Sequence, residues 1–282
     1  MSNIIAIANQ KGGVGKTTTS VNLAAALAEA EQRVLLVDMD AQGNATMGVG
    51  VDKAALDATV CDFLLGDKGV SEALQVVLDG AFYLLGANGD MTAAEVGLRE
   101  RKNGRLALKA ALAEISHSFD YVIIDCPPAL SMLTVNALAA ARGVIIPMQC
   151  EYYALEGLSA LLETIESVRK MMNPELIIEG VLMTMHDPRN RLTGDVSAQL
   201  HEYFGDAVYK TVIPRNVRLA EAPSHGLPIM QYDNGASGAA AYRALAAEIL
   251  GRDESEVIGA PKAGARRAVS ALFGRRGRRS SG

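Results

Sequence analysis

The stretch Asn9–Thr18, NQKGGVGKTT, follows an apolar run at Ile4–Ala8 and precedes apolar residues spaced as on one face of a helix. Its glycines Gly12, Gly13 and Gly15 let the backbone turn N–H groups inward, because no Cβ blocks the dihedral angles required. The helix that follows adds the positive end of its dipole at the same place. A strand, a glycine-rich loop and a helix in this order predict a phosphate-binding loop.

The polar residues of this loop indicate which phosphate compound it binds. Lys16 is placed to reach the β- and γ-phosphates of a nucleoside triphosphate, and the Thr17 hydroxyl is placed to ligate Mg²⁺. Val14 and Thr18 complete the segment around the phosphates. The alternative, a glycine-rich turn without a ligand, leaves the preceding strand and the motifs described below unexplained. We therefore predict a nucleoside triphosphate and Mg²⁺ as ligands.

Length and composition limit the class of protein. With 282 residues, 49% of them hydrophobic, the chain can bury a large core, and one large α/β domain fits as well as two small ones. No apolar run approaches the roughly 18 residues of a membrane span, and a strand from Ile4 leaves no room for a cleaved signal peptide. Cys61, Cys126 and Cys150 lack CxxC spacing and fit buried, reduced thiols. We expect a cytoplasmic protein.

The charges are unevenly distributed along the chain. The net charge is −5, yet residues 259–282 hold seven of the 27 basic residues and none of the 32 acidic ones. An acidic body and a basic tail suggest two electrostatic roles. We predict a P-loop nucleotide-binding domain at residues 1–258 and a basic, mostly disordered tail at residues 259–282, because glycine, alanine, serine and arginine dominate the tail.

Apolar runs of strand length alternate with helical patterns along the body. The expected strands are Ile4–Ala8, Val34–Val37, Phe82–Leu85, Tyr121–Ile124, Val144–Pro147, Ile177–Met183 and Val208–Ile213. The expected helices are Thr17–Ala30, Gly104–Ile115, Ser131–Ala141, Glu156–Met172, Asp195–Tyr203 and Ala239–Leu250. Near-continuous Val, Ile and Leu runs are typical of strands covered on both faces. The pattern predicts an α/β fold with a doubly wound, mostly parallel sheet flanked by helices.

Aspartates follow two of these strands, where ligands bind in parallel sheets. Asp38 and Asp40 end the run LLVDMD, and Asp125 ends YVIID before a Pro-Pro pair. An aspartate after a strand is often only a turn former, but here both cases share a chain with the phosphate loop. We expect Asp125 to hold Mg²⁺ through water, as in a Walker B strand, and Asp38 to support either Mg²⁺ or the segment that follows it.

Several segments together resemble the chromosomal, Soj-like ParA partition ATPases. The loop has Gln10 where the standard pattern has glycine and adds Lys11, which gives KGGVGKT, the deviant Walker A motif shared by ParA, MinD and the nitrogenase iron protein. The resemblance covers about residues 2–250 and also rests on VDMDAQGNAT, YVIIDCPPAL, GVLMTMHDPRN and IPRNVRLAEAPSHGLPI. It implies ATP binding and hydrolysis, an ATP-sandwiched homodimer and a nucleoid-associated protein. It also implies sequence-independent binding of double-stranded DNA and stimulation by a ParB-like partner.

The resemblance also implies roles for individual residues. Lys11 reaches the partner's nucleotide across the dimer interface and joins Lys16 in catalysis, while Asp40 positions the attacking water. Pro214 and Asn216 match the adenine-contacting loop. The residues matching or neighbouring the family's DNA-contacting positions are Arg189, Arg215 and Arg218. Without the resemblance, these arginines fit solvated loops or local salt bridges equally well.

A membrane-cycling, MinD-like ATPase is the alternative function. Residues 265–273, ARRAVSALF, place apolar side chains on one helical face between arginines, a basic amphipathic pattern that suits a membrane surface. The same arginines suit added affinity for DNA. The identity of the partner and cargo, and the choice between chromosome and plasmid, stay open.

Overall fold

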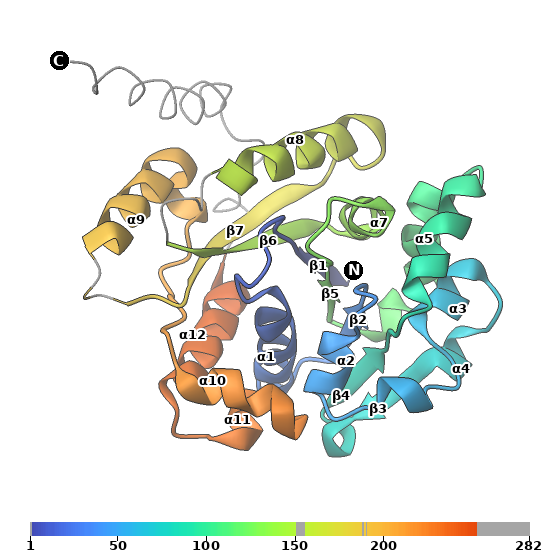
Figure 1. Ribbon diagram of the computed structural model, residues 1–282, viewed down its shortest axis with the longest axis horizontal. Coiled ribbons are helices and arrows are strands. Elements are labelled where there is room, and N and C mark those ends of the chain that lie inside the picture. Colours follow the sequence, from blue (N-terminus) through green and yellow to red (C-terminus); the bar gives the residue numbers. More distant parts are fainter. Residues whose placement is uncertain (1, 151–155, 188, 190, 253–282) are drawn as a thin grey trace.

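A seven-stranded sheet forms the centre of the molecule (Figure 1). The computed structural model describes residues 2–252 apart from residues 151–155, 188 and 190. The strands are β1 (Asn3–Ile7), β2 (Val34–Asp38), β3 (Leu74–Val77), β4 (Phe82–Leu85), β5 (Tyr121–Asp125), β6 (Gly143–Gln149) and β7 (Ile177–Thr184). Their order is β3-β4-β2-β5-β1-β6-β7, and all neighbours pair in parallel except β3 with β4. The predicted fold class is confirmed.

Helices cover both faces of this sheet. The longer ones are α1 (Lys16–Glu29), α5 (Met91–Glu100), α6 (Ala107–Ala113), α7 (Met132–Ala140), α8 (Glu156–Met171), α9 (Arg191–Phe204) and α12 (Ser237–Gly251). The shorter ones are α2 (Asn44–Gly48), α3 (Val60–Leu65), α4 (Val70–Ala73), α10 (Val217–Glu221) and α11 (Ile229–Tyr232). Short 3₁₀ turns occupy Lys53–Ala55, Leu78–Gly80, Gly104–Leu106, Ser116–Ser118, Gly205–Ala207 and Ala222–His225.

The alternation of side chains along each strand divides the core into two clusters. In β1, Ala6 joins the cluster under α3 and α5–α9, whereas Ile5 and Ile7 join the cluster under α1, α2 and α10–α12 (Figure 1). All three side chains are fully buried. Burial on both faces explains why most of the strands read as nearly continuous apolar runs in the sequence.

The strand register brings the carboxyl ends of three central strands together. Asp125, the last residue of β5, lies opposite Ile7 of β1 on one side and Asp38 of β2 on the other. The phosphate loop leaves β1 at this edge, and the segment containing Asp40 leaves β2 there. One edge of the sheet therefore gathers the predicted nucleotide, metal and water-positioning residues.

The prediction of a strand at Val208–Ile213 is wrong. Residue Val208 makes a single bridge to β7, and the Tyr209 ring then occupies the space over Gly180, where an added Cβ would lie 2.2 Å from Cε2 of Tyr209. The next two N–H groups, of Lys210 and Thr211, donate to the Glu248 carboxylate of α12 at 2.8 and 2.9 Å. Donors directed at a helix cannot extend a ladder, so the segment stays irregular.

Other boundaries differ from the sequence prediction. The expected helix Gly104–Ile115 is a 3₁₀ turn followed by the shorter α6, and the helix expected from Asp195 begins at Arg191. The sequence prediction omitted β3 and the helices α2–α5, which lie between β2 and β5, and also the short helices α10 and α11. The predicted boundary at residue 258 and the tail at residues 259–282 lie outside the described residues.

Candidate functional site: a phosphate loop at the carboxyl edge of the sheet

The loop between β1 and α1 has the backbone of an anion-binding loop. Gly13 and Gly15 have φ angles of 74° and 85°, values that residues with a Cβ rarely adopt. Gly15 caps α1 without a side-chain hydrogen bond, so no side chain blocks the first N–H groups of the helix. The glycines therefore expose backbone donors next to the positive end of the α1 dipole.

Side chains from outside the loop fix its shape. The buried Asn9 amide donates to the carbonyl of Pro147 in β6 at 2.7 Å and accepts the Lys11 N–H at 3.0 Å. On the other side, the Thr184 hydroxyl at the end of β7 donates to the Val14 carbonyl at 2.9 Å. The loop is thus held between two strands.

The predicted phosphate lysine turns back onto its own loop. Lys16 is 7% exposed, and its Nζ donates to the Lys11 carbonyl at 3.1 Å. Burial lowers the pKa of Lys16, while the nearby Asp125, Cys126 and Asp40 oppose that change. A buried ammonium beside the phosphate loop suits a bound phosphate, which would supply further acceptors.

Two hydroxyls of α1 contact the predicted metal-binding carboxylate. Thr17 Oγ1 donates to Asp125 Oδ2 at 2.8 Å, and Ser20 Oγ donates to Asp125 Oδ1 at 2.7 Å. Asp125 is fully buried, and burial, followed by the charge of Asp38, raises its pKa. Mg²⁺ prefers oxygen ligands, and the Thr17 hydroxyl lies beside the Asp125 carboxylate. These residues therefore fit Mg²⁺.

Asp38 holds the segment that carries Asp40. The Asp38 carboxylate accepts the Asp40 N–H at 3.1 Å, the Thr46 N–H at 2.9 Å and the Thr46 hydroxyl at 2.8 Å. Burial raises the pKa of Asp38. Asp40 is half-buried and accepts the Gln42 N–H at 3.0 Å. These bonds hold the segment that follows Asp38, and the metal role expected for Asp38 stays a prediction.

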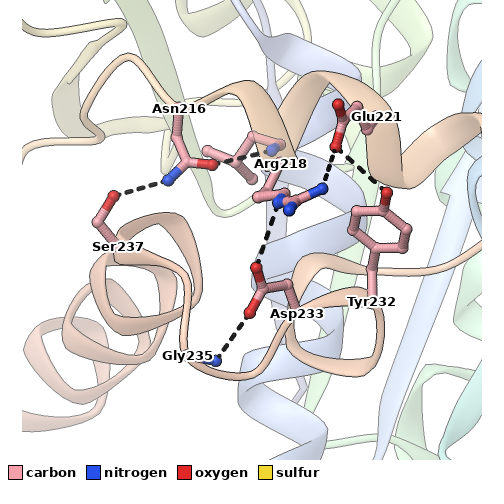
Figure 2. A network of polar contacts seen from close by, with 8 residues as sticks. Asn216, Arg218, Glu221, Tyr232, Asp233, Gly235 and Ser237 are labelled. Atoms are coloured by element: carbon pink, nitrogen blue, oxygen red, sulfur yellow. Dashed lines mark hydrogen bonds and ion pairs between the residues drawn. The ribbon is translucent and has the colours of Figure 1, made fainter.

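The predicted adenine loop lies where β7 ends and α10 begins. Pro214 makes a bridge with His186 after β7. Asn216 caps α10 by accepting the Leu219 N–H at 3.1 Å, and its amide donates to Ser237 at the start of α12 at 2.7 Å (Figure 2). Asn216 therefore joins two helices at the position where the resemblance places the base.

The three predicted DNA-contacting arginines are exposed and lie near this loop in sequence. Arg189 follows β7, Arg215 precedes α10 and Arg218 lies within it. Backbone bonding brings the two segments together, since the Arg215 N–H donates to the His186 carbonyl at 3.1 Å. Arg189 and Arg218 also form ion pairs with carboxylates of their own surroundings.

Sequence reasoning missed four side chains of the site: Asn9, Ser20, Thr46 and Thr184. The spacing of Ser20 from Thr17 offered a signal, because residues three apart share a helix face. Thr184 ends a parallel strand, which is another signal. The bond from Thr46 to Asp38 depends on the path of the chain after β2 and had no signal in the sequence.

The three cysteines are buried, as expected, and burial raises the pKa values of Cys61 and Cys150 to about 11.

Within residues 2–252, as far as they are described, no group of three His, Cys, Asp or Glu side chains could hold a metal ion by itself. In the same part of the chain, no helix is both long and apolar enough to cross a membrane.

Known proteins are similar to this chain in sequence. A family model described as an AAA domain matches residues 2–178. The sporulation initiation inhibitor protein Soj of Bacillus subtilis is 52% identical over 88% of this chain and 98% of its own length. The chromosome partitioning protein ParA of Myxococcus xanthus is 48% identical over 90% of this chain and 89% of its own length.

A solved structure is also similar to this chain in sequence and fold. The cobyrinic acid a,c-diamide synthase of Mycobacterium smegmatis, with bound ADP and magnesium, is 40% identical and superposes with a TM-score of 0.76. It covers 89% of this chain, which covers 94% of it. The phosphate loop, the strand-end aspartates and the relatives named for partitioning lead to one conclusion. The chain belongs to the ParA/Soj family of chromosome-partitioning ATPases.

Proposed function

We propose that this ATPase binds Mg²⁺-ATP at the carboxyl edge of β1, β2 and β5, dimerises around it and holds DNA until hydrolysis releases it. The observation that supports the proposal most directly is the convergence of Lys16, Thr17 and Asp125 beside the glycine loop. The ADP and magnesium bound by the Mycobacterium smegmatis protein support the same ligands here.

Each residue of the site has a separate part in this proposal. Lys16 gives up its carbonyl bond for the β- and γ-phosphates, and the N–H groups around Gly12–Thr18 cradle them. Thr17 and Asp125 would hold Mg²⁺, which neutralises the phosphate oxygens when bound. Asp38 keeps the following segment in place, and Asp40 orients the water that attacks. The loop of Pro214 and Asn216 would contact the base.

We assign Lys11 a role in the dimer, as in the family. Its main chain already belongs to the loop, since its N–H is bonded to Asn9 and its carbonyl to Lys16. The side chain would then reach the nucleotide of a second copy. Lys11 is therefore expected to affect dimerisation and hydrolysis more than nucleotide binding.

The DNA step rests on exposed arginines in an otherwise acidic body. Arg189, Arg215 and Arg218 would contact phosphates without reading bases, so affinity should fall linearly with the logarithm of salt concentration. Two copies in one dimer double the number of contacts. We propose that a ParB-like partner then stimulates hydrolysis and that the dimer resides in the cytoplasm on the nucleoid.

A membrane-cycling function depends on residues 265–273, which lie outside the described part of the chain. Co-sedimentation separates the two functions: random-sequence duplex DNA and anionic liposomes are each tested with and without ATP. Retention by DNA only with ATP supports partition, whereas retention by liposomes alone refutes it. A chain that ends at residue 258 should keep ATP binding and lose part of its DNA affinity. Replacing both Leu272 and Phe273 with serine should abolish liposome binding if the tail binds lipid. The same substitutions should change DNA binding little if the tail binds DNA.

A further inference from the structure

Arg189 is neutralised by a neighbour in its own loop. Its Nη2 lies 2.8 Å from Asp187 Oδ2 and its Nε 2.9 Å from Asp187 Oδ1, a two-pronged pair. The Arg189 N–H also donates to Asp187 Oδ1 at 3.0 Å. These bonds lower the pKa of Asp187 to about 2, so the carboxylate stays charged at any working pH.

Arg218 lies between two carboxylates from different segments. Its Nη1 lies 2.8 Å from Glu221 Oε2 in α10, and its Nε lies 3.5 Å from Asp233 Oδ2 after α11 (Figure 2). The same Glu221 oxygen accepts the Tyr232 hydroxyl at 3.2 Å, and Asp233 accepts the Gly235 N–H at 3.2 Å. One cation between two anions gives this cluster a net charge of −1.

We infer that Asp187, Glu221 and Asp233 act on DNA binding as positioning residues that compete with DNA phosphates for the two arginines. A phosphate that approaches Arg218 meets a site without excess positive charge, and it must displace a carboxylate to bind. The inference rests on the proposed function, because it concerns the arginines assigned there to duplex DNA.

The position of Asn216 connects this arrangement to the nucleotide. Asn216 caps the helix that carries Arg218 and is also bonded to Ser237 of α12. Asp233 lies on a separate segment between α11 and α12. A nucleotide base that engages Asn216 therefore acts on the helix that carries Arg218 and, through Ser237, on the start of α12, four residues after Asp233. The separation of Arg218 from Asp233 is the step through which ATP would increase DNA affinity.

The test measures affinity for a labelled random-sequence duplex at low salt, with and without a non-hydrolysable ATP analogue. Asp187→Asn and Asp233→Asn should each raise the ATP-free affinity about two- to fivefold, the range for an exposed ion pair. They should change the ATP-bound affinity less, so the ratio between the two states falls. Asparagine keeps an acceptor for Gly235, and Asp233→Glu, which retains the charge, should keep the wild-type ratio.

Asp120→Asn is the matched control. Asp120 holds Arg33 by the same two-pronged geometry, at 3.0 Å to Nε and 2.8 Å to Nη2, and it precedes β5 at the opposite edge of the sheet. An equal gain in Asp120→Asn, or no gain in both test variants while the wild type binds DNA with ATP, overturns the inference. A wild type that fails to bind DNA even with ATP refutes the proposed function instead.

Discussion

Replacing Asp125 with asparagine should stabilise the nucleotide-free protein while it removes ATP hydrolysis. The carboxylate is fully buried, opposes Asp38 in the next strand and receives neutral hydroxyl donors from Thr17 and Ser20. Asparagine has the same shape and still accepts from Ser20, and its amide can donate to the Thr17 oxygen. The substitution therefore removes a buried charge and reverses the bond with Thr17, whose hydroxyl hydrogen loses the acceptor that Asp125 supplies.

The magnitude follows from the pKa of Asp125, which burial and Asp38 raise from 3.8 to about 7. Between these two values the folded chain keeps a proton that the unfolded chain has released, so stability falls as pH rises. At about 1.4 kcal/mol for each tenfold change in ionisation, the free energy lost by pH 8 is on the order of 4 kcal/mol. Asparagine has no proton to release, so its advantage should shrink as pH falls toward 5.

Urea unfolding at pH 8 and pH 5 measures this effect. Asp125→Asn should be about 2–4 kcal/mol more stable than the wild type at pH 8, with a smaller gain at pH 5. Asp120→Asn is the control of opposite sign, because Arg33 lowers the pKa of that exposed carboxyl to about 2. A less stable Asp125→Asn at pH 8 would show that the charge is compensated, with Lys16 as the nearest cation to examine. Mg²⁺-ATP should stabilise the wild type more than the variant.

Four other substitutions test the remaining assignments. Lys16→Ala should lower ATP affinity at least tenfold in a filter-binding assay, because the phosphates lose a charge-assisted donor worth about 1.5–3 kcal/mol. Lys11→Ala should retain ATP but fail to dimerise in light scattering. Asp40→Ala should bind ATP and accumulate as a dimer, and hydrolysis at the wild-type rate would disprove its role. Arg218→Glu should weaken DNA binding with unchanged ATP affinity, as measured by anisotropy and calorimetry.

The sequence predicted the part of the fold that local patterns determine. The run Ile4–Ala8 and the loop to Thr18 are contiguous, so their strand, turn and helix could be assigned without knowing the rest of the chain. The aspartates Asp38 and Asp125 end hydrophobic strands, and parallel strands in one sheet bring such ends together. Their proximity was therefore predictable, and the register of β2 with β5 confirms it.

Elements that depend on distant partners were not predictable in this way. The segment Val208–Ile213 has the composition of a strand, but Glu248 takes its N–H groups and Gly180 admits the Tyr209 ring. Neither partner can be identified from the segment itself. The edge strand β3 is a strand that the sequence prediction missed. It pairs with β4 and leaves Val76 62% exposed, so it lacks the burial on both faces that produces long apolar runs in the other strands.

The same distinction separates the two parts of the site. Phosphate binding requires glycines and a lysine at fixed spacing within one short loop, so the phosphate site can be recognised in a linear sequence. The net charge around Arg218 depends in part on a carboxylate from a distant part of the sequence, that of Asp233, fifteen residues beyond it. Counting basic residues therefore overstates the positive charge available to DNA. The ion pairs determine how much of that charge a phosphate can reach, and the pair between Arg218 and Asp233 can be found only after the chain is folded.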